Sequence, residues 1–174
     1  MIVEIMGARI LAPFYGSTIY VWSSLITSTL AALALGYYFG GKLADKRPDM
    51  NILYFVIGLA GVLVFFIPFY SNPVLIWTDV LGLRFGPLAA SAALFIPSLF
   101  LLGMVSPFAV KLATHKIENV GFRAGSLYAL ATLGSLLGAL LAGFVLAPNF
   151  SVGSIINYSS LVLIFIYLIW RVIR

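Results

Sequence analysis

Long apolar runs dominate this chain and limit the folds that it can adopt. A helix needs about 20 apolar residues to cross roughly 30 Å of hydrocarbon. Five runs have about that length: Thr18–Gly41, Ile52–Tyr70, Leu88–Val110, Leu127–Ala147 and Ile155–Ile173. Only 9% of the residues are charged, whereas a soluble domain carries about 25%. The sequence therefore predicts an all-α integral membrane protein, with one transmembrane domain over residues 1–174.

The opening stretch, Ile2 to Phe14, is apolar but short. At 1.5 Å rise per residue it reaches only about 20 Å. It lacks the basic start and the small-residue cleavage site of a signal peptide. We therefore interpret it as the outer part of a first helix, whose beginning is either missing from this chain or not needed. That interpretation gives about six transmembrane helices.

Basic residues fall almost entirely on one side of the predicted bundle. Eight of them share that side: Lys42, Lys46, Arg47, Lys111, Lys116, Arg123, Arg171 and Arg174. Arg84 lies on the other side, and Arg9 lies within the first segment. Because cytoplasmic loops carry an excess of Lys and Arg, we expect a multi-pass protein of the cell membrane with both termini cytoplasmic. The same placement accounts for the net charge of +5, so nucleic-acid binding is not expected.

Two of the predicted spans carry the same pattern of small and polar residues. The second span has Tyr20, Ser24, Thr27, Ala31 and Ala34, spaced 4, 3, 4 and 3 residues apart. The fifth has Tyr128, Thr132, Ser135, Ala139 and Ala142, each offset by 108 residues from its counterpart. Each set lies on one helix face. We expect the two faces to line a shared cavity near the bilayer midplane.

This offset predicts three helices followed by three similar helices. Because three is odd, the second unit enters the membrane from the opposite side, as in the inverted-topology repeats of secondary transporters. We place repeat 1 at about residues 1–70, an external loop at 71–86 and repeat 2 at about 87–174. Glycines four residues apart, Gly36 with Gly40 and Gly134 with Gly138, favour close packing between helices of one chain over a dedicated dimer interface.

Glu4 is the acidic residue that falls inside a predicted span. It lies about 15 Å deeper than Phe14 along the helix, close to the bilayer midplane. A carboxylate at that depth usually marks an ion, proton or substrate site. Two other interpretations stay open: a frayed terminus, or a local pair with Arg9.

Asp45 follows the second span, in the stretch from Gly40 to Pro48. It is either part of a charged helix end that stops at Pro48 or a gating contact with a neighbouring helix end. The chain has no cysteine, and no paired carboxylates or Ser/His/Asp set appear in the sequence. We therefore expect no enzyme activity, no metal site and no cofactor.

Four stretches of the chain resemble the membrane portion of the fused spermidine-synthase-like proteins. They are RILAPFYGS (Arg9–Ser17), LALGYYFGGKLAD (Leu33–Asp45), FLLGMVSP (Phe100–Pro107) and GSLYALATLGS (Gly125–Ser135). In that family a transporter-like helical bundle usually precedes a cytosolic aminopropyltransferase-like domain. The resemblance covers only the bundle, which puts any enzymatic role in doubt. The stretch from Gly41 to Lys46 also resembles the loop between the second and third helices of major facilitator transporters, which implies that Asp45, with Lys42, gates the cytoplasmic side.

The resemblance implies a half-size, half-major-facilitator-like bundle that binds or moves a polyamine or another small cation. We expect Glu4 to pair with the cation and the two polar faces to line its path. The substrate-binding candidates are Glu4, Tyr20, Ser24, Thr27, Tyr128, Thr132 and Ser135. Half a transporter cannot enclose a two-sided cavity, so a homodimer or a partner chain is expected besides membrane lipid. The alternative is a non-transporting anchor or scaffold for an aminopropyltransferase-like enzyme.

Overall fold

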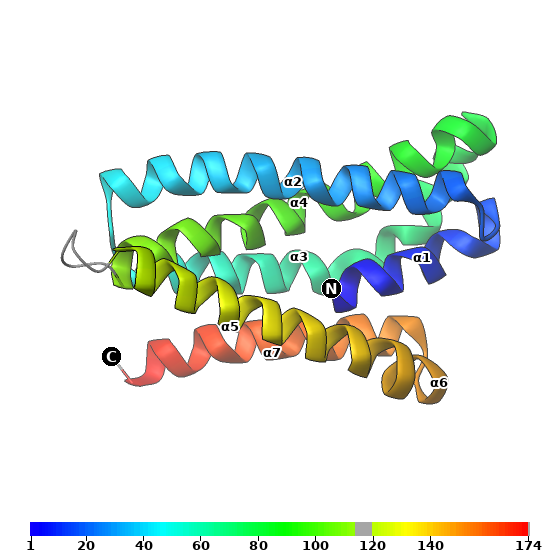
Figure 1. The fold of residues 1–174 in the computed structure, drawn as a ribbon. Helices are drawn as coiled ribbons and strands as arrows, with labels where there is room; N and C mark the ends of the chain where they lie inside the picture. Colours follow the sequence, from blue (N-terminus) through cyan, green and yellow to red (C-terminus); the bar gives the residue numbers. More distant parts are fainter. Residues whose placement is uncertain (114–119, 174) are drawn as a thin grey trace.

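The computed structural model describes residues 1–113 and 120–173, and its regular elements there are all helical (Figure 1). Lys116 and Arg174, two of the basic residues counted above, lie outside the described residues. The elements are α1 (Ile2–Tyr15), α2 (Ile19–Lys46), α3 (Met50–Asp79), α4 (Gly82–Ala113), α5 (Val120–Leu140), η2 (Leu141–Leu146), α6 (Ala147–Asn149) and α7 (Val152–Ile173). η2 is a π-helical segment that continues α5 into α6.

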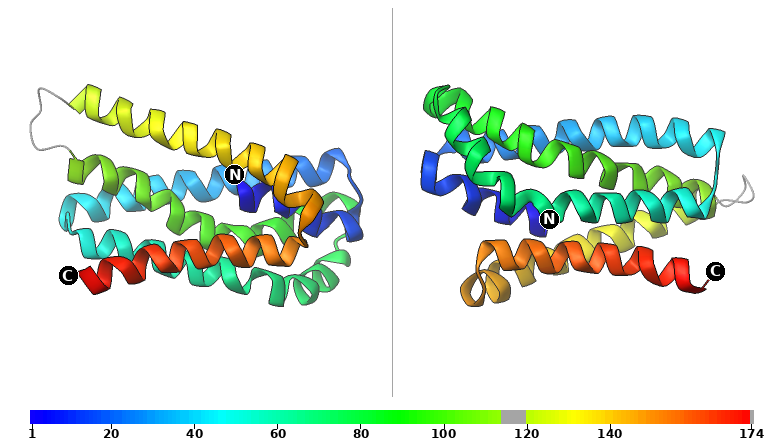
Figure 2. Two further views of the ribbon diagram at one scale, coloured as in Figure 1. Left: turned by 90° about the horizontal axis from the view of Figure 1, so that it is seen from below. Right: turned by 180° about the vertical axis from the view of Figure 1, so that it is seen from behind.

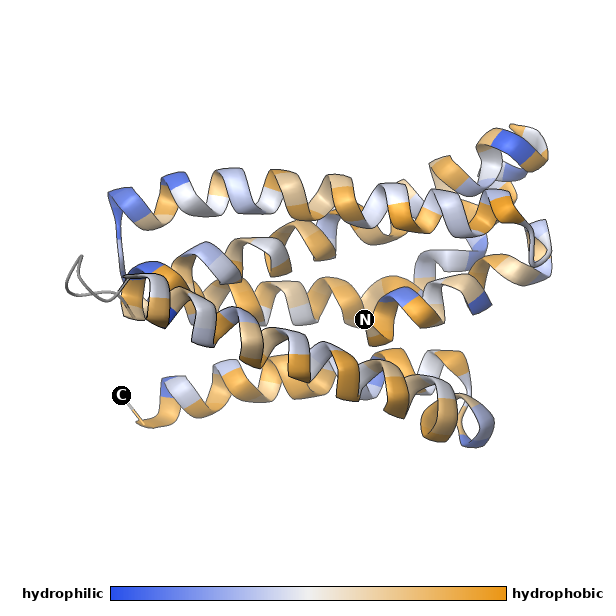
Figure 3. Ribbon diagram, in the orientation of Figure 1, coloured by the Kyte–Doolittle hydropathy of each residue, from blue (hydrophilic) through white to orange (hydrophobic). Residues whose placement is uncertain are grey.

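Five helices in the described residues are long and apolar enough to cross a membrane, judged by length and composition. They are Ile19–Lys46, Met50–Asp79, Gly82–Ala113, Gly121–Asn149 and Val152–Ile173. The five predicted spans are therefore confirmed as apolar helices, and all five helices are longer than predicted. α1 has 14 residues, which reach about 21 Å. Figure 3 shows that hydrophobic residues dominate the middle of the helices and that the most hydrophilic residues lie mainly near the helix ends.

The predicted external loop at residues 71–86 is helical almost throughout. α3 continues to Asp79, and only Val80 and Leu81 separate it from α4. Pro68 and Pro73 lie inside α3, where a soluble helix would normally break. Apolar residues continue around these prolines, and neighbouring helices in a membrane bundle can satisfy the backbone groups that proline leaves without a partner.

α2 and α4 form the closest helix pair of the bundle. A Cβ added to Gly36 would lie 2.9 Å from the Cα of Gly103, and one added to Gly40 would lie 2.6 Å from the Cα of Met104. Both positions therefore need glycine, because the helix backbones almost touch there. Further along the pair, the hydroxyls of Ser28 and Ser91 are hydrogen-bonded at 2.8 Å. The expected intrachain packing of Gly36 and Gly40 is thus confirmed.

The other helices surround this pair unevenly. α3 packs against α4 and α7, whereas α1 contacts α2, α4 and α7. α5 and its continuation to Asn149 run along the outside (Figure 2), and only 6% of the most apolar stretch of Gly121–Asn149 is buried, compared with 44% for that of α4. A Cβ added to Gly134 would have no neighbouring atom within 4 Å, and one added to Gly138 would meet only the side chain of Ile2, at 3.6 Å. These two glycines therefore lack the close backbone contact that Gly36 and Gly40 make.

The two ends of the bundle differ in charge. The C-terminal ends of α2, α4 and α7 lie at the same end as the start of α5 (Figure 1). That end carries the basic residues of the described chain other than Arg9 and Arg84: Lys42, Lys46, Arg47, Lys111, Arg123 and Arg171. Arg84 lies at the opposite end, beside the turn between α3 and α4. The charge asymmetry that the sequence predicts is therefore an asymmetry of the folded bundle.

Gly36→Ala should destabilise the bundle by about 1 to 3 kcal/mol, the usual cost of overpacking, because its Cβ would meet the backbone of α4. The matched variant Gly134→Ala adds the same methyl group to α5 where no neighbour lies within 4 Å. Alanine has a higher helix propensity than glycine, so this control should be neutral or slightly stabilising. Thermal unfolding in detergent, followed by circular dichroism, measures both. Equal midpoints would contradict the α2–α4 contact.

Candidate functional site

An open groove lies beside the start of α1, which begins in the middle of the bundle rather than at one end (Figure 1). The cavity has a volume of about 510 Å³ and is mostly apolar. Four helices contribute to its wall, through residues that include Ile2, Leu99, Leu102, Gly134, Gly138 and Tyr158. The small residues of α5 thus form one side of this groove, opposite the start of α1.

A second cavity, of about 240 Å³, continues the groove between α4 and α5. Val105 and Ala109 form its α4 side, and Leu127 and Tyr128 form its α5 side. Ala131 lines both cavities. The groove therefore runs from the first turn of α1 toward the basic end of the bundle, with a surface suited to an apolar chain or helix.

Glu4 lies in the first turn of α1 and is partly buried. At 1.5 Å rise per residue it is about 16 Å from the end of α1 at Tyr15. Among the described residues, no basic side chain forms an ion pair with it. Arg9, the alternative local partner, instead donates a hydrogen bond from Nη1 to the carbonyl oxygen of Ala147 at 2.7 Å.

The polar face of α2 is divided between the outside and the inside of the bundle. Tyr20 and Thr27 are exposed. Ser24 is buried, and its carbonyl oxygen accepts a hydrogen bond from the Ser91 hydroxyl at 3.2 Å. Of these three side chains, only Ser24 is therefore in contact with the core.

The polar face of α5 is exposed at all three positions: Tyr128, Thr132 and Ser135. The Thr132 hydroxyl donates to the carbonyl oxygen of Tyr128 at 2.8 Å, so it is satisfied within its own helix. Ser135 lines the larger cavity. α5 packs against α1 and α4, and the two polar faces do not meet in one cavity among those described here.

Sequence reasoning missed the polar contact that α2 does make. Ser28 and Ser91 are both buried, and their hydroxyls join α2 to α4. Ser28 follows Thr27 in the sequence, but successive residues point about 100° apart around an α-helix. Ser28 therefore lies on the inward face, whereas Thr27 is exposed. Ser91 is flanked by alanines, Ala90 and Ala92. A serine among small residues is a weak signal, and only the helix pairing shows its role.

The ends of α2 and α4 are joined by an ion pair. Lys111 Nζ lies 2.7 Å from Asp45 Oδ1, and both side chains are largely exposed. Lys42 stays on its own helix, where its Nζ donates to the Tyr38 hydroxyl at 2.6 Å and lies 4.3 Å from the centre of the Tyr38 ring. Of the two gating candidates, Asp45 therefore contacts a neighbouring helix end and Lys42 does not.

Within the described residues, no group of three or more His, Cys, Asp or Glu side chains is placed to hold a metal ion. The arrangement offers an apolar groove, a carboxylate near mid-bundle and hydroxyl-bearing outer faces. Comparisons with protein-family models, curated proteins and solved structures found no match to this chain.

The Asp45–Lys111 contact is open to a direct cross-linking test. The natural chain has no cysteine, so the double variant Asp45→Cys/Lys111→Cys carries only two thiols. A short bis-maleimide should join them with one linker, because the ion pair of the natural residues holds these two helix ends side by side. Intact mass should then show one linker per chain. The control pair Asp45→Cys/Arg84→Cys spans opposite ends and should take up two linkers. Two linkers on both pairs would contradict the contact.

Proposed function

We propose that this chain is one half of a transporter-like assembly that binds or moves a polyamine or another small cation, rather than an enzyme. In this proposal the bundle is a half-major-facilitator-like, 3+3 inverted repeat. α1, α2 and α3 form the first unit, and α4, α5 with its continuation, and α7 form the second. The basic end faces the cytoplasm with the C-terminal end of α7, as the excess of Lys and Arg favours, and α1 runs from mid-bundle toward the opposite side.

The observation that carries the proposal is the pattern of helix packing. In such a repeat α1 corresponds to α4, α2 to α5 and α3 to α7. The counterpart of the α2–α4 contact is then the α5–α1 contact, and the counterpart of the α3–α4 contact is the α7–α1 contact. The α3–α7 contact maps onto itself. All of these pairs are in contact, as expected where an inverted repeat relates the two halves.

The difference between the units lies in the length of α1. α4 has 32 residues and α1 has 14. α2 therefore packs along a full-length helix, whereas its counterpart α5 meets only the first residues of α1. This shortfall leaves open the groove between α4 and α5, and it explains why glycines pack closely on α2 but not on α5.

A second copy of the chain would give the exposed polar faces a partner. Tyr20 and Thr27 on α2, and Tyr128 and Thr132 on α5, are exposed. Hydroxyls in hydrocarbon prefer a helix partner or water, and each such bond contributes about 0.6 to 2 kcal/mol. We therefore place the cation path between two bundles, lined by these faces, instead of within one bundle.

Glu4 supplies the negative charge of the proposed path, and Asp45 supplies the gate. Glu4 lies near mid-bundle without a basic partner among the described residues, so a cation can neutralise it there. Breaking the exposed Asp45–Lys111 pair costs little, because exposed ion pairs are worth about 0 to 1 kcal/mol. Such a pair suits a contact that forms and breaks during transport.

The apolar lining of the groove favours the second candidate, a non-transporting anchor or scaffold for an aminopropyltransferase-like enzyme. An anchor needs a stable bundle in lipid and no polar path. In that case Glu4 has no ligand, and its substitution changes only the bundle itself.

Glu4→Gln should weaken spermidine binding about tenfold, which corresponds to 1.4 kcal/mol, because it removes the carboxylate that pairs with the cation. Isothermal titration calorimetry on purified protein measures the affinity. The control Asp79→Asn removes an exposed carboxylate at the end of α3 and should leave the affinity unchanged. Equal affinities for Glu4→Gln and the unmodified protein would refute the role of Glu4, and no binding to the unmodified protein would favour the anchor.

A further inference from the structure

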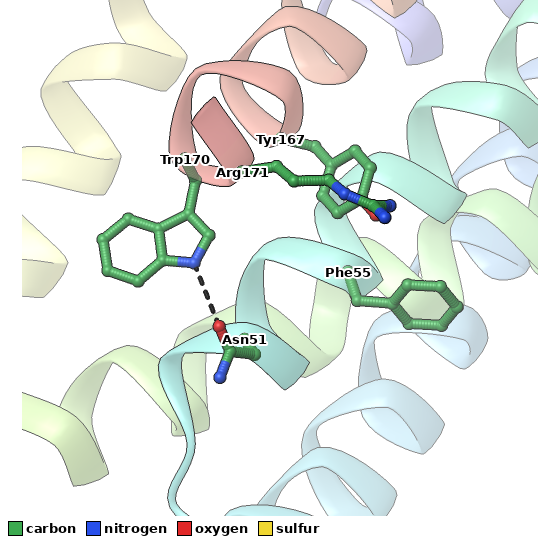
Figure 4. Close-up of a pocket in the computed structure, with 5 residues that line it drawn as sticks. All are labelled: Asn51, Phe55, Tyr167, Trp170 and Arg171. Carbon is green, nitrogen blue, oxygen red and sulfur yellow. Dashed lines mark hydrogen bonds between the residues drawn. The ribbon is translucent and has the colours of Figure 1, made fainter. Parts of the chain in front are cut away.

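A separate pocket of about 350 Å³ lies at the basic end of the bundle, between the first turns of α3 and the last turns of α7 (Figure 4). It is lined by Asn51, Phe55, Tyr167, Trp170 and Arg171. It lies away from Glu4 and from the groove beside α1, and the proposed transport path does not use it.

The back of this pocket is held in a fixed arrangement. The Trp170 indole donates from Nε1 to Asn51 Oδ1 at 3.3 Å (Figure 4). Its ring also stacks on Tyr54, with the ring centroids 4.4 Å apart and the planes inclined by 10°. On its other side, the Asn51 amide donates to the Asp49 carboxylate at 2.8 Å. Asn51 is thus oriented by two partners, and its amide hydrogens are directed to Asp49 and not to Trp170.

Arg171 supplies the positive charge at the mouth of the pocket. It is exposed and donates from Nη1 to the Tyr167 hydroxyl at 3.2 Å. In the described part of the chain it has no carboxylate partner. A guanidinium has five N–H donors arranged to bind two oxygens of one phosphate, so donors remain for an anion.

The position of the pocket along α7 fits the headgroup level of a bilayer. The helix is apolar from Leu161 to Ile169, and Tyr54, Tyr167 and Trp170 gather beside the pocket. Trp and Tyr favour this level because one part of each ring system is apolar and another is polar. Phe55 gives the pocket an apolar wall beside the charged group (Figure 4). A ligand that fits both is an amphiphile whose negative charge adjoins an apolar part.

We propose that this pocket binds the phosphate of an anionic phospholipid in the leaflet that faces the basic end. Arg171 holds the phosphate oxygens together with the Tyr167 hydroxyl, and Phe55 contacts the start of the acyl chains. Basic pockets between transmembrane helices are suited to such headgroups. The proposal is independent of the cation path, since it uses neither Glu4 nor the polar faces.

Trp170 provides a local probe of binding. The chain has three tryptophans, and the other two, Trp22 and Trp77, are exposed. Trp22→Phe/Trp77→Phe therefore leaves Trp170 as the single emitter in the full-length protein. In vesicles, brominated phosphatidylglycerol should quench Trp170 more than brominated phosphatidylcholine at the same mole fraction, with a preference of about fivefold.

Arg171→Gln in this background should abolish the preference, whereas Lys46→Gln, which removes an exposed charge from the same end, should keep it. Unchanged Trp170 emission in neutral vesicles would show that Arg171→Gln leaves the pocket intact. Equal quenching by the two lipids, or a preference that survives Arg171→Gln, would overturn the proposal. Displacement of the brominated lipid by millimolar inorganic phosphate would also overturn it, because the site would then bind the free anion.

Discussion

Helices in a lipid bilayer gain no hydrophobic free energy by packing together, because the lipid tails are as apolar as leucine side chains. Close backbone contact therefore has to hold such a bundle. In this chain α2 and α4 provide it, where Gly36 and Gly40 meet Gly103 and Met104 and where Ser28 and Ser91 share a hydrogen bond. α3 packs on α4, and α7 packs on α3. The remaining helices are thus positioned through this one pair.

The fold was predictable where the signal is local. Apolar length defines a membrane helix from a single stretch of sequence, so all five long spans were predicted. The segment at residues 71–86 was predicted as an external loop, because it separates two apolar runs and contains Asn72-Pro73, Asp79 and Arg84. Here Pro68 and Pro73 lie inside α3, since the surrounding bundle, and not the local sequence, decides whether a membrane helix continues.

The site was predictable only in part, because each side chain acts through a neighbour that the sequence does not identify. Periodicity placed Tyr20, Ser24 and Thr27 on one helix face, but it could not show which neighbouring helix that face meets. Ser24 is buried at α4, while Tyr20 and Thr27 remain exposed. Asp45 was one of several charges at a helix end, and its contact with Lys111 depends on how α2 and α4 pair. The short α1 leaves α5 with an open face, for which we propose a partner bundle.

Intermolecular cross-linking in native membranes tests most directly whether the exposed polar face of α5 meets a second copy. Single cysteines at Thr132, on that face, and at Phe165, on the exposed apolar side of α7, give two matched variants of a cysteine-free chain. The half-transporter account predicts a covalent dimer from Thr132→Cys after mild oxidation and none from Phe165→Cys. A dimer from Phe165→Cys alone, or a monomer from both, would contradict it.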